Sequence, residues 1–250
     1  MKTIAVINLK GGCGKTTTVI AMADLLDRKY NKRILIIDND KQGNAAKAMR
    51  CYDADAPAYT GEMLLSADAA GNIIHTYREN IDIIPCNLKM ELAETGIKKE
   101  QGAQHDRYRR ALEKVREEYD YCIIDNPPSI GISVINAIVA ADDIIIPVQQ
   151  DEWSISGLTE LTEQIQNIRT LNPDARIAGC LITDYEKSDT SEAAEQWLRT
   201  RSGQPFFKQK IRHTRKVKDS THYRQAVTEY SRRSAAAQDY RKFMMEYMGE

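Results

Sequence analysis

The chain has 250 residues, of which 42% are hydrophobic, and its 35 basic and 36 acidic residues leave a net charge of -1. This length and apolar content suit one hydrophobic core, so a single domain is expected over residues 1–250. The balanced charge gives no sign of a nucleic-acid or membrane partner, and no apolar run reaches the roughly 18 to 20 residues that span a bilayer.

The first residues, Met1 to Ile4, enter a strand pattern without any signal-peptide pattern. We therefore expect a cytoplasmic protein, and one without an N-terminal helix-turn-helix extension. The five cysteines are widely scattered and lack the paired spacing of a zinc site or a disulfide framework. We expect them to be reduced and mostly buried: Cys13, Cys51, Cys86, Cys122 and Cys180.

Short, β-branched, almost continuously apolar runs alternate with helical stretches along the chain. Continuous apolar runs are typical of strands that are covered on both faces. The pattern predicts an α/β fold with one doubly wound, mostly parallel sheet, helices on both faces and a site at the carboxyl ends of the strands. Residues 49–79 show the least pattern. The expected strands are Thr3–Asn8, Arg33–Asp38, Ile81–Pro85, Tyr121–Asp125, Asp143–Val148 and Ala175–Thr183.

The first strand leads into a glycine loop, and a helical run from Thr18 to about Lys29 follows. Glycines let successive backbone N–H groups point inward, and a helix N-terminus adds positive potential, so this order predicts a P-loop NTPase fold that binds a polyphosphate. Lys15 is expected to reach the β- and γ-phosphates, and the Thr16 hydroxyl to bind magnesium. The expected ATP-binding residues are Lys10, Gly11, Gly12, Cys13, Gly14, Lys15, Thr16 and Thr17.

This loop departs from the ordinary Walker A motif, because Leu9 stands at the position of the first glycine and a second lysine stands at Lys10. In this deviant form the chain resembles the ParA/MinD family of partitioning and positioning ATPases. The resemblance implies a homodimer that forms with ATP, in which Lys10 reaches the phosphates of the partner. The alternative is a solvated lysine beside a turn.

The second strand ends in Asp38-Asn39-Asp40-Lys41-Gln42-Gly43-Asn44. Side chains alternate along an extended segment, so Asp38 and Asp40 project the same way; one can support a metal and the other a water. The segment resembles the family signature Asp-x-Asp-Pro-Gln-Gly-Asn, with Lys41 in place of proline. The resemblance assigns water positioning to Asp40 and an outer-sphere metal role to Asp38. A turn with solvated carboxylates is the alternative.

A third acidic terminus, Asp125-Asn126-Pro127-Pro128-Ser129, follows an apolar strand. Together with the upstream phosphate loop this is the Walker B pattern, so Asp125 is the expected magnesium partner through a coordinated water. Asn126 departs from the small residue or cysteine that is common in the family.

The resemblance extends over nearly the whole chain. Residues 179–185 are similar to the family's strand and loop near the adenine base. The next such loop usually reads Ile-Pro-Arg, whereas here it is Ile211-Arg212-His213 without the proline, which puts the base contacts in doubt.

Residues 199–242 contain thirteen Lys or Arg and three Asp or Glu, so a nearly neutral chain has a strongly basic segment. Such a segment predicts binding to DNA phosphates without sequence preference. An ordinary solvated surface is the alternative. The expected DNA-binding residues are Lys208, Lys210, Arg212, Arg215, Lys216 and Lys218.

The resemblance implies an ATPase that uses ATP and Mg²⁺, binds DNA as a dimer, associates with the nucleoid in the ATP state and is stimulated by a ParB-like centromere-binding protein. It favours ParA over two relatives of similar fold, iron–sulfur carriers and tyrosine autokinases. A MinD-like membrane-bound ATPase would need residues 240–250 to lie on lipid, whereas we expect a terminal helix docked on the body and no membrane partner. A nucleotide-gated DNA-binding regulator is a further alternative.

Overall fold

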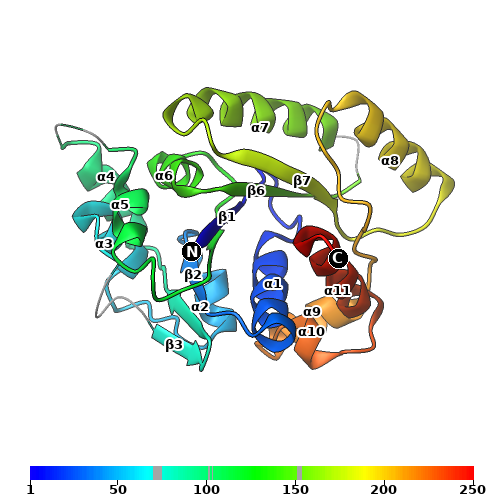
Figure 1. The fold of residues 1–250 in the computed structure, drawn as a ribbon, viewed down its shortest axis with the longest axis horizontal. Helices are drawn as coiled ribbons and strands as arrows, with labels where there is room; N and C mark the ends of the chain where they lie inside the picture. Colours follow the sequence, from blue (N-terminus) through cyan, green and yellow to red (C-terminus); the bar gives the residue numbers. More distant parts are fainter. Residues whose placement is uncertain (70–74, 101, 103, 151–153) are drawn as a thin grey trace.

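The computed structural model describes residues 1–69, 75–100, 102, 104–150 and 154–250. They form a seven-stranded sheet in the order β3-β4-β2-β5-β1-β6-β7, in which every neighbouring pair is parallel except β3 with β4 (Figure 1). This confirms the predicted fold class, and the six expected strands all form. The strands are β1 (Lys2–Val6), β2 (Ile34–Asp38), β3 (His75–Arg78), β4 (Ile81–Ile84), β5 (Tyr121–Asp125), β6 (Asp143–Val148) and β7 (Arg176–Ile182).

Helices cover both faces of the sheet, with α1 and α11 on one face and α6 and α7 on the other (Figure 1). The helices are α1 (Lys15–Tyr30), α2 (Asn44–Ala48), α3 (Tyr59–Ser66), α4 (Met90–Ile97), α5 (Arg107–Glu113), α6 (Ile132–Ala140), α7 (Ser154–Ile168), α8 (Asp189–Arg201), α9 (Arg215–His222), α10 (Val227–Tyr230) and α11 (Ala235–Met248). A short 3₁₀ helix, Arg169–Leu171, follows α7.

The alternation of side chains along each strand divides the core between the two faces. In β1, Ile4 and Val6 pack in the cluster that contains α1 and α11, whereas Ala5 packs in the cluster that contains α6 and α7. All three are fully buried. The continuous apolar runs in the sequence arise because each strand must satisfy two apolar layers.

The weakly patterned stretch 49–79 contains α3 and the antiparallel edge strand β3, which the sequence pattern did not predict. The strand sequence His-Thr-Tyr-Arg is polar, and its position depends on distant partners. The Arg78 guanidinium lies 2.9 Å from Asp24 and 2.9 Å from Glu229. Because ion pairs help to hold this edge strand, its sequence lacks the apolar run from which the other strands were predicted.

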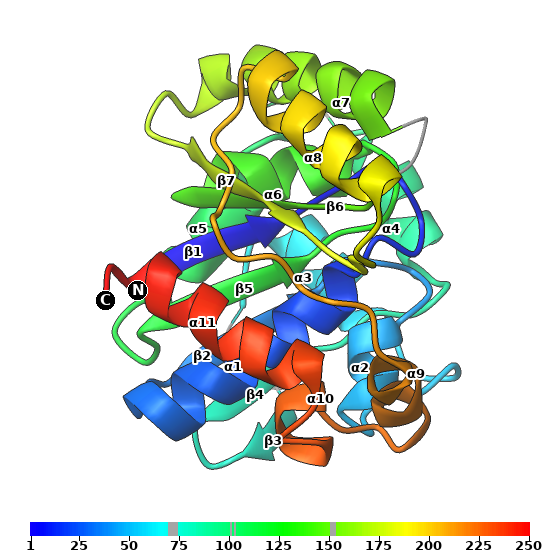
Figure 2. The same ribbon diagram turned by 90° about the vertical axis from the view of Figure 1, so that its right-hand side faces the viewer.

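The C-terminal helix α11 packs against the body of the protein and lies along α1 (Figure 2). Tyr240, Phe243 and Met244 on its inner face are at most 1% exposed. The Tyr247 hydroxyl donates a 2.7 Å hydrogen bond to Asp143 at the start of β6. The expected docked helix is therefore present. No helix among the described residues is long and apolar enough to cross a membrane.

The packing of α11 predicts unequal effects of two substitutions on that helix. Phe243→Ala should lower the free energy of unfolding by about 3 to 5 kcal/mol, because it removes a fully buried ring and leaves a cavity. Met245→Ala, at a side chain 40% exposed, should cost less than about 0.5 kcal/mol. Urea denaturation of both variants measures this, and equal effects would contradict the docking of α11.

Candidate functional site

The phosphate loop connects β1 to α1 at the carboxyl edge of the sheet. Gly12 and Gly14 have φ values of 77° and 85°, in the left-handed region that favours glycine. Gly14 is the N-cap of α1, so the loop ends on the positive end of a helix. Lys15 is buried, and its ammonium donates a 2.8 Å hydrogen bond to the Lys10 carbonyl. The structure thus brings a cation and a curled glycine backbone together, as expected of a phosphate site.

Side chains from three strand ends hold this loop in place, and the sequence reasoning did not identify them. Each is an amide or hydroxyl that donates to a backbone carbonyl, which satisfies groups that the irregular backbone leaves unpaired. The hydrogen bonds run from Asn8 to Pro147 O (2.6 Å), from Gln149 to Gly12 O (3.1 Å) and from Thr183 to Cys13 O (2.8 Å). The loop is therefore fixed from the side of β6 and β7.

The predicted carboxylates converge on this loop from two adjacent strands. Asp38 is paired in register with Asp125, the last residue of β5, which lies between β2 and β1 in the sheet. The Thr16 hydroxyl donates a 2.7 Å hydrogen bond to Asp125. Asp38 and Asp125 are at most 1% exposed and Asp40 is 9% exposed. The parallel register thus places residues far apart in the sequence beside the first turn of α1.

Burial makes ionisation of Asp38 and Asp125 unfavourable. It raises the pKa of Asp38 well above its usual range, and the negative charge of Asp125 adds to that effect. Burial raises the pKa of Asp125 to about 7; the hydrogen bond from Thr16 and the charge of Lys15 oppose this shift, whereas Asp40 reinforces it. A divalent cation beside these groups would favour their ionised forms.

The donor atoms present fit a magnesium ion that is shared with a nucleotide. Asp125 Oδ1 is buried and has no hydrogen-bond partner among the described residues, next to the Thr16 hydroxyl. Both oxygens of Asp38 accept backbone N–H groups, from Ala46 (2.8 Å) and Asp40 (3.2 Å), which suits an outer-sphere role. The described residues contain no group of three His, Cys, Asp or Glu side chains able to hold a metal alone. Magnesium typically takes few protein ligands and completes its shell with water and phosphate oxygens.

A cavity of about 140 Å³ adjoins the phosphate loop and brings together the two segments expected near the base. Tyr185 and Arg212 form a parallel bridge between these segments, and His213 lies 2.8 Å from Asp184. Arg212 does not enter the cavity as a free cation, because its guanidinium binds Asp239 at 2.7 and 2.8 Å. The cavity is lined by Gly12, Cys13, Gly14, Thr17, Gln149, Thr183, Asp184, Ile211, Arg212, Val217 and Tyr240.

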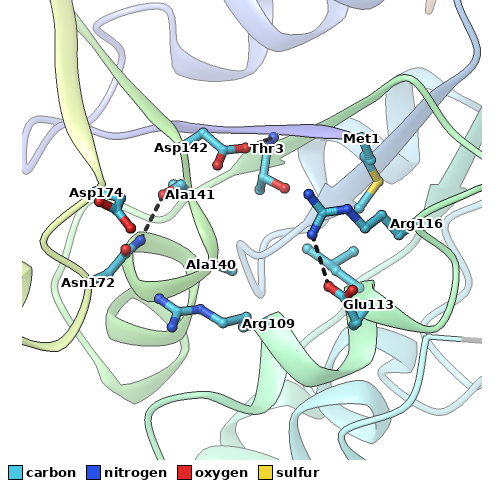
Figure 3. Close-up of a pocket in the computed structure, with 11 residues that line it drawn as sticks. Met1, Thr3, Arg109, Glu113, Arg116, Ala140, Ala141, Asp142, Asn172 and Asp174 are labelled. Carbon is cyan, nitrogen blue, oxygen red and sulfur yellow. Dashed lines mark hydrogen bonds and ion pairs between the residues drawn. The ribbon is translucent and has the colours of Figure 1, made fainter.

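A larger cavity of about 220 Å³ lies at the opposite, amino-terminal edge of the sheet (Figure 3). Its polar groups bind nearby backbone: Asp142 accepts from Thr3 N (2.7 Å), and Asn172 donates to Ala141 O (2.9 Å). Arg109 donates to the carbonyl of Val139 at the end of α6. These contacts give the polar side chains of this cavity a structural role, whereas the expected site residues lie at the carboxyl edge.

The six expected DNA-binding residues divide between two segments. Lys208, Lys210 and Arg212 lie on the extended segment that runs beside β7, and the other three lie on α9 (Figure 2). Three of the six pair with acidic groups, as Lys210 with Glu195, Arg212 with Asp239 and Lys216 with Asp219. Arg215 and Lys218 are exposed on α9. The basic surface is therefore strongest at α9.

Two further cations near α9 were not among the six expected DNA-binding residues. Lys47 on α2 and Arg224 after α9 line a groove of about 440 Å³ that begins at Thr16 and Thr17. They belong to segments far apart in the chain, and only the fold brings them to the same groove. The basic surface thus reaches the first turn of α1.

The sequence of the chain is similar to a known protein family and to proteins of chromosome partitioning and sporulation. A family model described as an AAA domain matches residues 1–177. The chain is 39% identical over 184 residues to the sporulation initiation inhibitor protein Soj of Bacillus subtilis, covering 73% of this chain and 72% of Soj. It is 30% identical over 252 aligned positions to the chromosome partitioning protein ParA of Caulobacter vibrioides, covering 98% of this chain and 93% of that protein.

Among solved structures, cobyrinic acid a,c-diamide synthase from Mycobacterium smegmatis, with a bound ATP analog and magnesium, matches with a TM-score of 0.85. The sequences are 27% identical, and the match covers 97% of this chain and 92% of that one.

The raised pKa of Asp125 predicts a pH-dependent effect of Asp125→Asn on stability, measured without nucleotide or metal. The unfolded carboxyl ionises above its usual pKa of 3.8, whereas the folded one stays neutral up to about 7, so stability is lost as pH rises through this window. Asparagine cannot ionise. Its advantage over aspartate should be small at pH 4 and should grow by at least about 1.4 kcal/mol, the value of one pKa unit, by pH 8.

Urea denaturation at the two pH values measures the difference. Asp55→Asn, at an exposed carboxylate, serves as the control and should show no such growth. A difference between Asp125→Asn and the native protein that stays constant with pH would contradict the buried, neutral state of Asp125.

Proposed function

The chain belongs to the ParA/Soj family of P-loop ATPases, and from this premise we propose that it is a DNA-partitioning switch. It dimerises with ATP and Mg²⁺, binds DNA without sequence preference as the dimer, and is released when a partner stimulates hydrolysis. The observation that carries the nucleotide part is the 2.7 Å hydrogen bond from Thr16 to the buried Asp125 beside Lys15. This is the arrangement that a P-loop and a Walker B carboxylate require.

Each residue of the site has a defined task in this proposal. The glycine loop and Lys15 bind the phosphates, and Thr16 and Asp125 hold the metal, Asp125 through a water. Asp38 supports that water from the outer sphere, and Asp40 orients the attacking water. Magnesium, when bound, neutralises charge on the phosphates. Lys10 contacts the phosphates bound to the partner subunit, so that only two ATP-bound copies form the complete site.

The DNA-binding part of the proposal rests on charge and position. Arg215 and Lys218 are exposed on α9, and Arg224 follows the helix at the rim of the groove that reaches Thr16. A cationic helix beside the nucleotide site suits phosphate contacts that are made only in the ATP-bound dimer. The partner would be a ParB-like centromere-binding protein, and the protein would be cytoplasmic and nucleoid-bound in its ATP state. Tyr240, Phe243 and Met244 of α11 pack inward, which favours a docked helix over one that lies on lipid.

Two single substitutions separate dimerisation from hydrolysis. Lys10→Ala should fail to dimerise with ATP, because the contact between subunits is lost. Asp40→Ala should dimerise but not release phosphate, because the attacking water is no longer oriented. Light scattering and a phosphate-release assay measure both properties, with Lys15→Ala as a control that should lose ATP binding. If the Lys10 and Asp40 variants scatter light alike, the role of Lys10 across the dimer is wrong.

The ATP-bound dimer should bind arbitrary duplex DNA with an affinity that falls steeply as salt rises, because each neutralised phosphate releases counterions. The double variant Lys216→Ala, Lys218→Ala should bind all duplexes more weakly, with a salt slope lower by roughly one unit per lost contact. ATP binding should be unchanged.

The matched control for this experiment is Lys98→Ala, Lys99→Ala, which removes two exposed lysines after α4. Fluorescence anisotropy at several salt concentrations gives both the affinities and the slopes. If the native protein with ATP and Mg²⁺ does not retain duplex DNA at low salt, the DNA-binding proposal must be abandoned.

A further inference from the structure

Asn39 lies between Asp38, the last residue of β2, and Asp40 in the loop that follows. The reaction proposed above assigns no role to Asn39. It is 1% exposed, so its amide needs internal hydrogen-bond partners. Because side chains alternate along an extended segment, Asn39 projects opposite to its two acidic neighbours. What holds Asn39 also fixes the direction in which Asp38 and Asp40 project.

The Asn39 amide is held by one buried chain of hydrogen bonds. The Tyr108 hydroxyl of α5 donates to Asn39 Oδ1 (2.8 Å), and Asn39 Nδ2 donates to Asn126 Oδ1 (2.8 Å). Asn126 Nδ2 then donates to the carbonyls of Val6 and Ile124, both at 3.2 Å. The chain of bonds therefore connects the carboxyl ends of β2, β5 and β1, which are the strands that supply the site.

The Tyr108 end of this chain is anchored by a second asparagine. The backbone N–H groups of Arg107 and Tyr108 donate to Asn136 Oδ1 of α6, at 2.8 and 3.4 Å. Asn136 Nδ2 donates in turn to Ile132 O (2.9 Å) and to Gln104 O (2.7 Å). Tyr108 is fully buried. The residue that carries the hydroxyl thus lies on a helix, α5, that is held to a second helix, α6.

We propose that Tyr108, Asn39 and Asn126 are positioning residues for ATP hydrolysis. Through their hydrogen bonds they keep the loop after β2 in the one conformation in which Asp38 faces Asp125 and Asp40 faces the attacking water. The proposal rests on the role given above to Asp40. A displacement of about 1 Å at a reacting group can reduce a rate by up to about 10²-fold, so the loss of one bond in this chain should affect turnover more than binding.

The test is Tyr108→Phe, which removes one hydroxyl and keeps the buried ring. The matched control is Tyr119→Phe. Tyr119 follows α5 and is 7% exposed, and its hydroxyl donates a 2.7 Å hydrogen bond to Asp82 in β4, away from the site. Each variant loses one hydrogen bond made by a tyrosine hydroxyl. Only the Tyr108 bond holds the loop after β2, because its acceptor is Asn39.

We expect kcat for ATP hydrolysis to fall about tenfold or more in Tyr108→Phe and less than about twofold in Tyr119→Phe. Calorimetry with ATP and Mg²⁺ should give dissociation constants within about twofold of the native value for both. Both melting temperatures should fall, because each variant loses one hydrogen bond. Asn39→Ala, which removes both links of the loop, should show the same separation of turnover from binding.

Equal turnover in Tyr108→Phe and Tyr119→Phe would overturn the proposal. A parallel loss of ATP affinity, melting temperature and turnover in Tyr108→Phe would also overturn it, because that outcome indicates a structural role alone. Asp40→Ala separates this proposal from the function on which it rests. If Asp40→Ala hydrolyses ATP normally, the proposed role of Asp40 is wrong; if it is inactive while Tyr108→Phe is normal, only the positioning role is wrong.

Discussion

The pairing of Asp38 with Asp125 across two adjacent parallel strands is the constraint around which the site is organised. Two carboxylates withdrawn from water and placed side by side repel each other, and ionising both without a nearby cation is costly. The surrounding structure reduces this cost with a hydrogen bond from Thr16, the cation of Lys15 and two backbone N–H groups to Asp38. A phosphate-bound divalent cation would offset the repulsion between the two carboxylates. The feature that makes the site unfavourable without a metal therefore also favours the binding of the metal that the proposed reaction needs.

The segment after β7 serves several purposes within a short stretch of chain. Ile211 and Arg212 line the cavity beside the phosphate loop, α9 presents exposed cations, and α11 completes one face of the core. Some basic residues of this segment form structural ion pairs and are not available to bind a partner. Arg212, which pairs with the buried Asp239, is an example. Val217 of α9 lines the cavity beside the phosphate loop and packs against the core. A partner that binds α9 would therefore contact a helix that is in direct contact with both.

Local sequence predicted much of the fold and of the site. The strands β1, β2, β4, β5, β6 and β7 were recognised because parallel strands buried on both faces need unbroken apolar runs. The phosphate loop was recognised because only glycines next to Lys15 and Thr16 give that backbone and those donors within a few residues. The edge strand β3 was not predicted, because its polar residues are held by ion pairs from α1 and α10.

The sequence by itself determined the candidates for the chemistry, since Lys15, Thr16 and the strand-terminal aspartates lie in motifs whose geometry is set by neighbouring residues. Only the tertiary structure decided how they are held and which charges stay available. The Asn39 to Asn126 bond joins residues 87 positions apart, and the Tyr108 to Asn39 bond joins residues 69 apart. The pairing of Arg212 with Asp239 depends likewise on the docking of α11. Such contacts leave no local pattern, because they depend on how whole strands and helices pack.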